Sequence, residues 1–426
     1  MESPKSIWKR LAIIVGSGSL IVSVKFAQAD SFTDNRLLFP IGEVEAFMAN
    51  TGVALSGSTG AVIFNPAGLG GFKNNRISLS GNAYMKVESE IVPLQTMDGT
   101  DLNFSTSGIQ AIPHSFVSTW RTSPWTLAFS IMVPYQIKLE DAVLYSSPIY
   151  PSIQLSRTNY FQLLMGGGSL AVNLTRETDV GLGCLYTMYQ TSQMVSFAGN
   201  TNGTPNAFVS NSFFRAEIAG VLCNAGMQSQ LTDKLRVGLS VQLPMIPLKK
   251  TGVSSTFVRH PSGVTQSEGP KPVDGEYKIP LDVGVGLEYR FSSVVHLYLD
   301  VSHQAEERFR SGDLLEAEIV NKATTRYNGG LRLKFSEGFQ VFAGAAYNPS
   351  ALVGSDDNVA EDYVVATMGF NWVKGNSSFG MGVMGARSSG SRKAPIYDAS
   401  IEPIGTKESS LRSDIFGILL SSGYIF

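Results

Sequence analysis

A long series of runs in which apolar and polar residues alternate constrains this chain more than any other feature. In 281–290, Leu, Val, Val, Leu and Tyr alternate with Asp, Gly, Gly, Glu and Arg. Positions 296–302 and 331–334 show the same alternation. Successive side chains of a strand point to opposite faces, so these runs predict strands with one apolar face and one polar face.

About fourteen such runs follow residue 75, and most have the ~10-residue length of a strand that crosses a membrane. They are expected at 76–86, 109–120, 125–139, 159–174, 179–195, 213–230, 235–246, 278–290, 294–303, 327–335, 339–347, 362–373, 377–387 and 410–426.

The connectors between these runs alternate strictly between short and long. The short ones are near 121–124, 175–178, 231–234, 291–293, 336–338 and 374–376. The long ones are near 87–108, 140–158, 196–212, 247–277, 304–326, 348–361 and 388–409. Outer-membrane barrels have short periplasmic turns and long external loops. We therefore expect an all-β fold, a transmembrane antiparallel β-barrel of about fourteen strands over 73–426.

The composition fits this class. Charged residues make up 16% of the chain, below the usual quarter of a soluble domain. Apart from the N-terminus, no segment approaches the ~20 apolar residues of a membrane helix. A formal net charge of −2 indicates no nucleic-acid surface. A large secreted β protein and an outer-membrane barrel remain as the two options.

The N-terminus predicts a secretory signal peptide. Lys5, Lys9 and Arg10 precede an apolar run at 11–24, and Ala27-Gln28-Ala29 forms a cleavage site before Asp30. The alternative, a membrane anchor helix, is less favoured because the apolar run is short for a span. The domain organisation expected is a signal peptide at 1–29, an N-terminal hatch at 30–72 and the barrel at 73–426.

Gly57–Phe72 combines rigid and permissive residues. Pro66 fixes its own φ and pushes Asn65 towards an extended conformation. The glycines at 68, 70 and 71 allow positive φ and close backbone approach. This composition suits backbone wedged into a confined space and fits poorly in a regular strand or helix. A short helix is expected at 43–50, but 30–72 has too little apolar surface to fold without a larger partner.

Asn65-Pro66-Ala67-Gly68-Leu69, after Ala61 to Phe64, resembles the hatch of FadL-type outer-membrane transporters. Those proteins are fourteen-stranded barrels that pass long-chain fatty acids or other hydrophobic compounds. The resemblance implies that 30–72 plugs the barrel around Asn65, Pro66, Ala67 and Gly68. It also implies passive uptake of hydrophobic molecules across the outer membrane of a bacterium.

Pro134 lies inside the third expected strand, where proline marks a break, a bulge or an edge. Val133-Pro134-Tyr135 resembles the Val-Pro-Phe-Gly of the FadL family, although Tyr-Gln replaces Phe-Gly here. In that family the third strand kinks and opens a gap in the wall. The resemblance implies a lateral exit for ligand at this position; a local bulge without a passage is the alternative.

Several charged residues are expected on the polar face of the strands, in the lumen. They are Arg215, Glu217, Asp282, Glu288, Arg290, Asp300, Arg332 and Lys334. Arg215, Arg290 and Arg332 could contact a ligand carboxylate. Ion pairs that brace the interior are the favoured interpretation, because unpaired burial is costly. Cys184 and Cys223 could pair across a hairpin, but the sequence does not show contact.

Catalysis finds little support. No histidine has metal-ligand spacing, and no phosphate-binding loop is present. We expect no enzyme activity, no cofactor and no metal. The expected function is passive uptake of hydrophobic molecules, by displacement of the hatch and lateral exit near Pro134. A polar-solute porin, a structural or interaction barrel and, least supported, a lipid hydrolase are the alternatives.

The chain closes with Ser422-Gly423-Tyr424-Ile425-Phe426. A terminal aromatic residue on an alternating strand is similar to the assembly signal of bacterial outer-membrane barrels. The expected partners are therefore hydrophobic small molecules, outer-membrane lipid and, during assembly, the barrel-insertion machinery. A monomer is expected.

Overall fold

The computed structural model describes residues 37–97, 99–146, 152–200, 208–259, 265–273, 276–310, 318–352, 360–397 and 403–426. The expected signal peptide and the first residues of the expected hatch lie outside this part of the chain. Among the described residues, no helix is long and apolar enough to cross a membrane.

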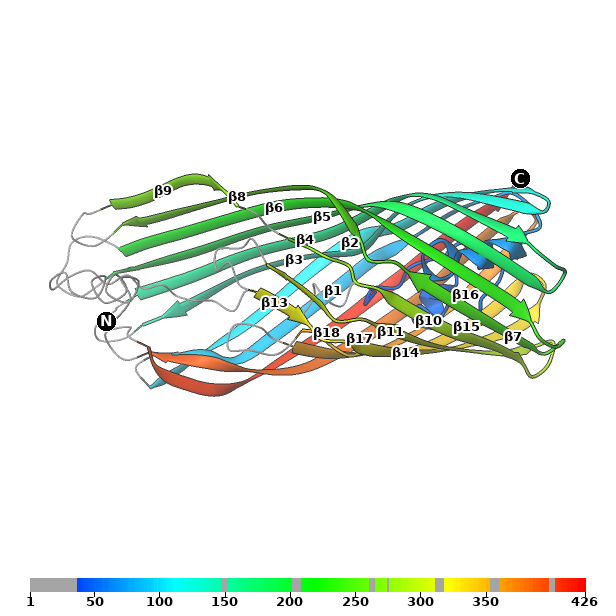
Figure 1. Cartoon of the computed structure of the whole chain (residues 1–426). Helices are drawn as coiled ribbons and strands as arrows, with labels where there is room; N and C mark the ends of the chain where they lie inside the picture. Colours follow the sequence, from blue (N-terminus) through cyan, green and yellow to red (C-terminus); the bar gives the residue numbers. More distant parts are fainter. Residues whose placement is uncertain are drawn as a thin grey trace.

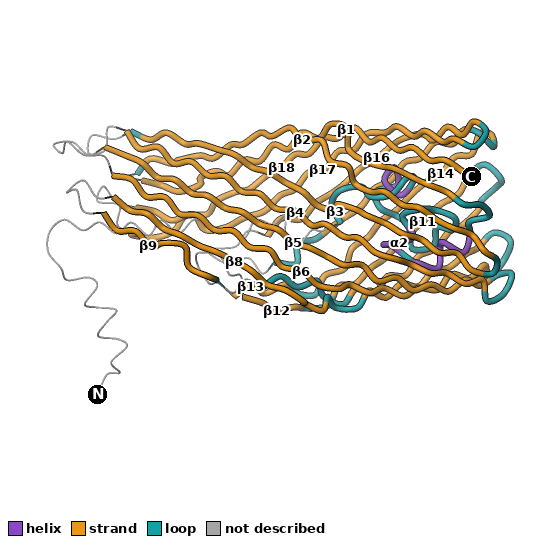
Figure 2. The backbone as a smooth tube through the Cα atoms, turned by 90° about the horizontal axis from the view of Figure 1, so that it is seen from above, coloured by secondary structure: helices purple, strands orange, loops and turns teal. Residues whose placement is uncertain are grey.

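The strands form a closed antiparallel barrel, seen from two directions in Figures 1 and 2. One sheet contains sixteen strands; β8 and β9 attach to one flank of β6, and the other fourteen close into a ring through the pairing of β5 with β6. The ring strands are β1 (Arg76–Met97), β2 (Thr100–Thr122), β3 (Trp125–Tyr145), β4 (Ser152–Asn173), β5 (Thr178–Asn200), β6 (Phe208–Gln230), β7 (Leu235–Gln242), β10 (Asp282–Arg290), β11 (Val295–Gln304), β14 (Thr324–Ser336), β15 (Phe339–Asn348), β16 (Ala360–Lys374), β17 (Ser377–Tyr397) and β18 (Pro403–Ile425). The predicted fold class is confirmed.

Four further strands lie outside the ring. They are β8 (Ile246–Arg259), β9 (Thr265–Pro272), β12 (Glu307–Arg310) and β13 (Glu318–Asn321). β8 pairs with the first half of β6, and β9 pairs with β8. β12 and β13 form a separate two-stranded sheet. These strands lie beyond the ends of the short ring strands β7, β10, β11 and β14.

All six predicted short connectors lie between the strands that they were expected to join. The prediction of long connectors is mostly wrong. β1 and β2 fill nearly all of 87–108, and eight ring strands reach 21 to 23 residues. The outer halves of these strands escaped prediction because their outward faces are largely polar there, while apolar residues such as Leu102 and Phe104 face the bore.

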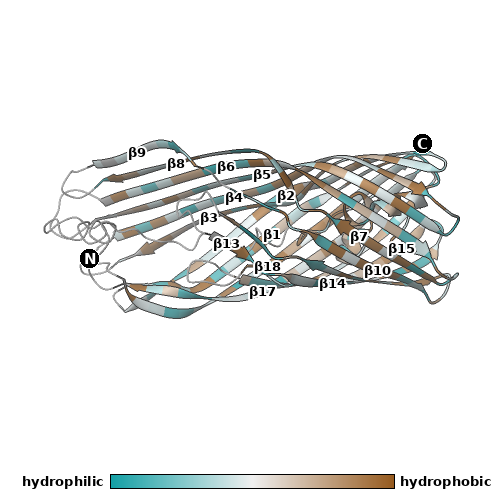
Figure 3. Cartoon of the chain, in the orientation of Figure 1, coloured by the Kyte–Doolittle hydropathy of each residue, from teal (hydrophilic) through white to brown (hydrophobic). Residues whose placement is uncertain are grey.

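The two faces of the strands separate as predicted, and the hydropathy colours alternate along single strands in Figure 3. On β11, Leu299 and Val301 are 47% and 44% exposed, whereas Tyr298 and Asp300 are 1% and 5% exposed. The apolar face therefore forms the exterior of the barrel and the polar face lines its bore.

The hatch, here Leu37–Phe72, lies inside the bore near the end with the short turns (Figures 1 and 2). It contains only the 3-10 helix η2 (Glu45–Met48), the α-helix α2 (Ala61–Phe64) and the 3-10 helix η3 (Pro66–Gly71). The helix predicted at 43–50 is thus reduced to one 3-10 turn. The expectation that 57–72 avoids helix is wrong, because it forms two short helical turns.

The wall is shaped to the hatch where strand glycines face it. A Cβ at Gly344 of β15 would overlap the backbone of Met48 and Ala49. A Cβ at Gly238 of β7 would overlap the backbone of Val53 and Ala54. Glycine is required at these positions because the two backbones approach each other directly.

Cys184 and Cys223, which are opposite each other on β5 and β6, form a disulfide. The sequence left this pairing open. The bridge joins two neighbouring ring strands covalently.

Replacing Gly344 by valine is expected to weaken hatch docking by about 1–3 kcal/mol, because the new side chain must displace the Met48 backbone. Protease cleavage within 37–72 of the purified protein measures hatch release. Gly385→Val is the matched control, because a Cβ at Gly385 meets no atom within 4 Å. Equal cleavage of the two variants would contradict direct backbone packing.

Candidate functional site

One side of the hatch is held by polar side chains from β11, β14 and β16. Asp300 Oδ2 accepts hydrogen bonds from the backbone N–H groups of Gly52, at 2.6 Å, and Val53, at 2.9 Å. The N–H of Ala49 donates to Thr367 Oγ1 at 2.8 Å, and Asn328 Nδ2 donates to the Ala49 carbonyl at 2.7 Å. The bonds to Gly52 and Val53 satisfy hatch backbone that has no ladder or helix partner.

Side-chain amides from β6 bind further backbone groups of the hatch, from Val53 to Ile63. Gln228 Nε2 donates to the carbonyls of Val53 and Leu55 at 2.9 and 3.1 Å. Asn224 Nδ2 donates to the carbonyls of Val62 and Ile63 at 3.2 and 3.3 Å. Both amides are buried, so the bonds form away from competing water.

The structure places Asn65 at the junction between the hatch and β6. Its φ of −164° and ψ of 101° are extended, as the following proline requires. Asn65 Nδ2 donates to the carbonyls of Val53, at 2.7 Å, and Met227, at 3.2 Å, while Oδ1 accepts from the N–H of Ala67 at 3.1 Å. One side chain thus caps η3, ties two parts of the hatch and contacts the wall.

The neighbouring motif residues are buried against the wall. Pro66 and Ala67 lie against Gly181 of β5, where a Cβ would overlap their backbone. Gly68 has no Cβ to meet the Leu55 carbonyl, which would lie 2.7 Å away. Close approach, rather than a positive φ, therefore explains this glycine.

Two glutamates stand at the start of the hatch in different environments. Glu43 forms an ion pair with Arg76 of β1 and accepts from Ser378 Oγ at 2.7 Å. Glu45 is fully buried and accepts from Ser58 Oγ at 2.5 Å, while its Oε2 has no partner among the described residues. Burial raises the pKa of Glu45 to about 7, although the Ser58 hydrogen bond opposes this rise.

The wall is interrupted next to the hatch, at the Pro134 position. The ladder between β2 and β3 ends at the Ser115–Met132 pair. On the other side of β3, Met132 pairs with Met165 of β4 and Tyr135 pairs with Leu163. Two residues of β3 therefore lie between these pairs, against one residue of β4. β3 therefore carries one extra residue here, and the bulge separates it from β2.

Side chains fill this interruption. His114 of β2 is buried, and its Nδ1 lies 3.0 Å from the Val133 carbonyl. From the hatch, Phe39 stacks on Tyr135 with ring centroids 5.8 Å apart and lies 6.3 Å from the His114 ring. The first described residues of the hatch thus close the inner side of the interruption.

An apolar lining covers the bore further from the short turns. Its buried residues come from β1, β2, β4, β5 and β18: Ile91, Leu94, Leu102, Phe104, Ile153, Leu155, Val195, Phe197 and Leu411. The Arg157 guanidinium lies 4.7 Å from the centre of the Phe104 ring, a cation–π distance. This lining gives apolar molecules a favourable surface on the outer side of the hatch.

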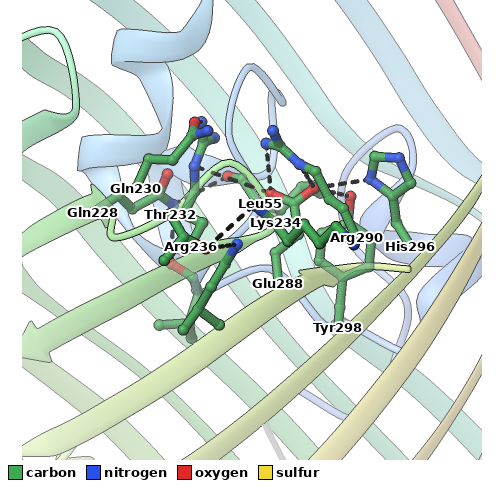
Figure 4. Close-up of polar contacts among 12 residues, drawn as sticks. Leu55, Gln228, Gln230, Thr232, Lys234, Arg236, Glu288, Arg290, His296 and Tyr298 are labelled. Carbon is green, nitrogen blue, oxygen red and sulfur yellow. Dashed lines mark hydrogen bonds and ion pairs between the residues drawn. The ribbon is translucent and has the colours of Figure 1, made fainter. Parts of the chain in front are cut away.

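A charged network lies in the bore at the short-turn end (Figure 4). Glu288 accepts two bonds from Arg290, at 3.0 and 3.1 Å, and one from Tyr298 at 3.0 Å. Arg332 Nη2 lies 2.9 Å from His296 Nδ1, which in turn lies 3.0 Å from Glu288. Arg290 is thus engaged by a carboxylate of the protein itself, as expected of bracing ion pairs.

The placement of Arg215 in the lumen is wrong. Its neighbours on β6, Phe214 and Ala216, are buried at 3% and 2%, whereas Arg215 is exposed on the opposite face. Glu217 shares that outer face and lies 3.5 Å from Lys249. Both faces of β6 combine polar and apolar residues here, so the sequence did not show which face points into the bore.

Sequence reasoning missed several residues that contact the hatch or the wall interruption: Phe39, His114, Asn224 and Gln228. Asp300 was expected in the lumen, but its bonds to hatch amides were not foreseen. A usable signal existed for Asn224 and Gln228, because polar amides at that spacing share one face of a strand.

No protein-family model and no curated protein matches this chain. Solved structures of similar fold do exist. The toluene transporter TodX of Pseudomonas putida matches with a TM-score of 0.64 at 13% identity, over 91% of this chain and 99% of TodX. A FadL homologue of Pseudomonas aeruginosa matches with 0.60 at 14% identity, over 91% and 98% of the two chains. The Ralstonia pickettii toluene transporter TbuX matches with 0.58 at 14% identity, over 91% and 99%.

These likenesses cover nearly the whole of each chain, so this protein shares the fold of the FadL homologue and of the two toluene transporters. At such low identity they show the fold alone.

Hatch docking is expected to weaken as pH rises, through Glu45. Below its ordinary pKa of 4.5 the carboxyl is protonated in docked and released hatch alike. Between 4.5 and about 7 only the docked hatch holds the proton, so docking loses up to about 3 kcal/mol and then stays level. Glu45→Gln should remove the contribution of Glu45 to this dependence. Hydrogen exchange of 37–72 between pH 4 and 9 tests it; parallel pH profiles for wild type and variant would contradict it.

Proposed function

We propose that this chain is a FadL-type outer-membrane channel for passive uptake of hydrophobic molecules, such as long-chain fatty acids or hydrocarbons. One observation carries the proposal: a hatch is packed in a closed barrel, directly beside an interruption of the wall. The fold shared with two toluene transporters and a FadL homologue supports the same function.

The exterior supports a place in the outer membrane. On β18 the outward residues from Phe426 down to Phe416 are mainly apolar, and Asp414 and Arg412 follow. A tilted strand of that length matches the ~25 Å apolar band of outer-membrane barrels. Trp120 and Trp125, 43% and 46% exposed, lie beside a short turn, where an aromatic girdle would meet the interface.

In the proposed path, ligand enters from outside, follows the apolar lining around Phe104 and reaches the hatch. The start of the hatch is its most easily moved part. Asn50 Nδ2 donates to the carbonyls of Leu37 and Phe39 at 2.8 and 2.9 Å, Asn50 Oδ1 accepts from the Ile41 N–H at 2.8 Å, and the side chains of Leu38, Phe39 and Ile41 pack in the apolar core. The displacement we propose moves Phe39 away from Tyr135 and connects the bore to the interruption.

Ligand would then leave sideways through the interruption at Val133, Pro134 and Tyr135. Transfer of an apolar molecule into water is unfavourable in free energy, and a lateral exit into lipid avoids that transfer. Nothing in this path consumes nucleotide, so transport follows the gradient and downstream consumption. Arg332 lies in the charged network at the short-turn end of the bore and is the residue we propose for contact with a ligand carboxylate.

Copurification separates this function from its rivals. Mass spectrometry of an organic extract of the purified protein should find fatty acid, hydrocarbon or detergent-like molecules. Free passage of sugars and ions through reconstituted protein would instead support a porin. A protein partner with no bound lipophile would support a structural barrel.

Deletion of Pro134 is expected to slow uptake of a hydrophobic substrate about tenfold, which corresponds to a barrier rise of ~1.4 kcal/mol. The deletion removes the extra residue of β3 and still leaves Met132 and Tyr135 facing the bore, so β3 can rejoin β2. Pro134→Ala keeps the residue count and serves as the control. Wild-type uptake by the deletion variant, with normal folding, would count against lateral exit.

A further inference from the structure

The wall has a second interruption, four strands away from Pro134. β7, β10, β11 and β14 all start or end at one level, where Gln242, Asp282, Gln304 and Thr324 are successive ladder partners. Beyond this level, β8 and β9 continue as a ribbon on β6, and β12 and β13 form their own sheet. Among the described residues, no ladder joins that ribbon to β12 or β13.

A short segment crosses the interruption on its inner side. This strap, Glu276–Leu281, runs from the β9 side down to β10, and its Tyr277 and Ile279 are buried at 6% and 1%. Tyr277 stacks on Tyr189 of β5 with ring centroids 4.0 Å apart and planes 8° apart. The strap therefore presents an aromatic and aliphatic surface to the bore.

The exterior at the same place is also apolar. Leu243, Ile246 and Leu248 are 51%, 62% and 62% exposed, and they extend the outward apolar row of β7. Met245, between them, points inward and is 5% exposed, and its N–H donates to the Ile279 carbonyl at 2.8 Å. One layer of backbone, broken at Pro244, thus separates an apolar outer surface from an apolar inner one.

Among the described residues no ladder holds the strap; its polar contacts are two partly exposed ion pairs and single hydrogen bonds, such as those from the Met245 N–H to the Ile279 carbonyl and from the Ala305 N–H to the Leu281 carbonyl. Lys250 lies 2.5 Å from Glu276, and Lys278 lies 3.2 Å from Glu307. Ion pairs exposed to this degree contribute little to stability. The strap can therefore move without the loss of a β-ladder, unlike the rest of the ring.

We propose that this interruption is a side entrance through which neutral hydrophobic molecules dissolved in the outer leaflet reach the bore. The molecule passes between Leu243 and Ile246, displaces Tyr277 from Tyr189 and arrives on the outer side of the hatch. This inference rests on the function proposed above and adds a second route of admission. Neutral compounds are favoured because Leu243, Met245, Ile246 and Tyr277, which form this path, are uncharged, and the neighbouring Glu276 and Lys278 are engaged in ion pairs. A carboxylate would lose its hydration among these side chains.

The test compares uptake of dodecane with that of dodecanoate by cells that carry the full chain. Ile246→Gln/Leu248→Gln should slow dodecane about tenfold, because each amide adds a desolvation cost to the entrance, and should leave dodecanoate within about twofold. Leu144→Gln is the matched control: Leu144 is 74% exposed on the outer part of β3, far from the strap. Equal dodecane uptake by all three proteins would overturn the side entrance.

A second measurement guards against misfolding of the double variant. Tyr277→Trp places a fluorophore on the strap, and brominated dodecane supplied in lipid vesicles should quench it in purified, reconstituted protein. Dodecane uptake without quenching would place admission elsewhere and overturn the inference alone. Failure of wild type to take up either dodecane or dodecanoate would overturn the proposed function itself.

Discussion

Unpaired backbone inside the bore is the constraint on which the rest of this structure depends. The described part of the hatch has three short helices and no strand, so backbone groups such as the N–H of Gly52 and the carbonyl of Val53 have no helix or ladder partner. Buried backbone groups must be satisfied. Asp300, Gln228 and Asn224 supply those partners from the barrel wall, and strand glycines such as Gly344 let the two backbones approach. The ring and the hatch are therefore one packing unit rather than a tube with a loose stopper.

The sequence predicted the parts of this structure that lipid dictates. Because one face of each strand contacts hydrocarbon, apolar residues recur at every second position, and this repeat predicted the ring strands and the short turns between them. Where the strands extend beyond the band, as in Arg76–Met97, neither face is required to be apolar, and strand was mistaken for loop. Arg215 was misplaced for the same reason. The hatch motif around Asn65 was visible as a local oddity, but its bonds to Met227 depend on tertiary proximity that spacing does not encode.

The two interruptions of the wall share a chemical signature. Pro134 marks the first and Pro244 the second, and neither can donate a backbone hydrogen bond to a neighbouring strand. In both places an aromatic side chain from a segment inside the bore covers the weakness: Phe39 against Tyr135, and Tyr277 against Tyr189. Each of the two interruptions is thus backed by stacked aromatic rings that lie inside the bore.

The exposed edge of β9 bears on whether neighbouring copies of the protein can associate through their sheets. β9 pairs only with β8, so among the described residues its other side is an unpaired edge. Unpaired strand edges can pair with the sheets of neighbouring molecules. The sequence there is Thr-Gln-Ser-Glu-Gly-Pro-Lys-Pro, in which two prolines lack the donor that such pairing needs, and Glu268 and Lys271 form an exposed ion pair at 2.9 Å. The free edge of β9 is therefore a poor template for pairing with a strand of a neighbouring copy, which disfavours edge-to-edge aggregation of the barrels.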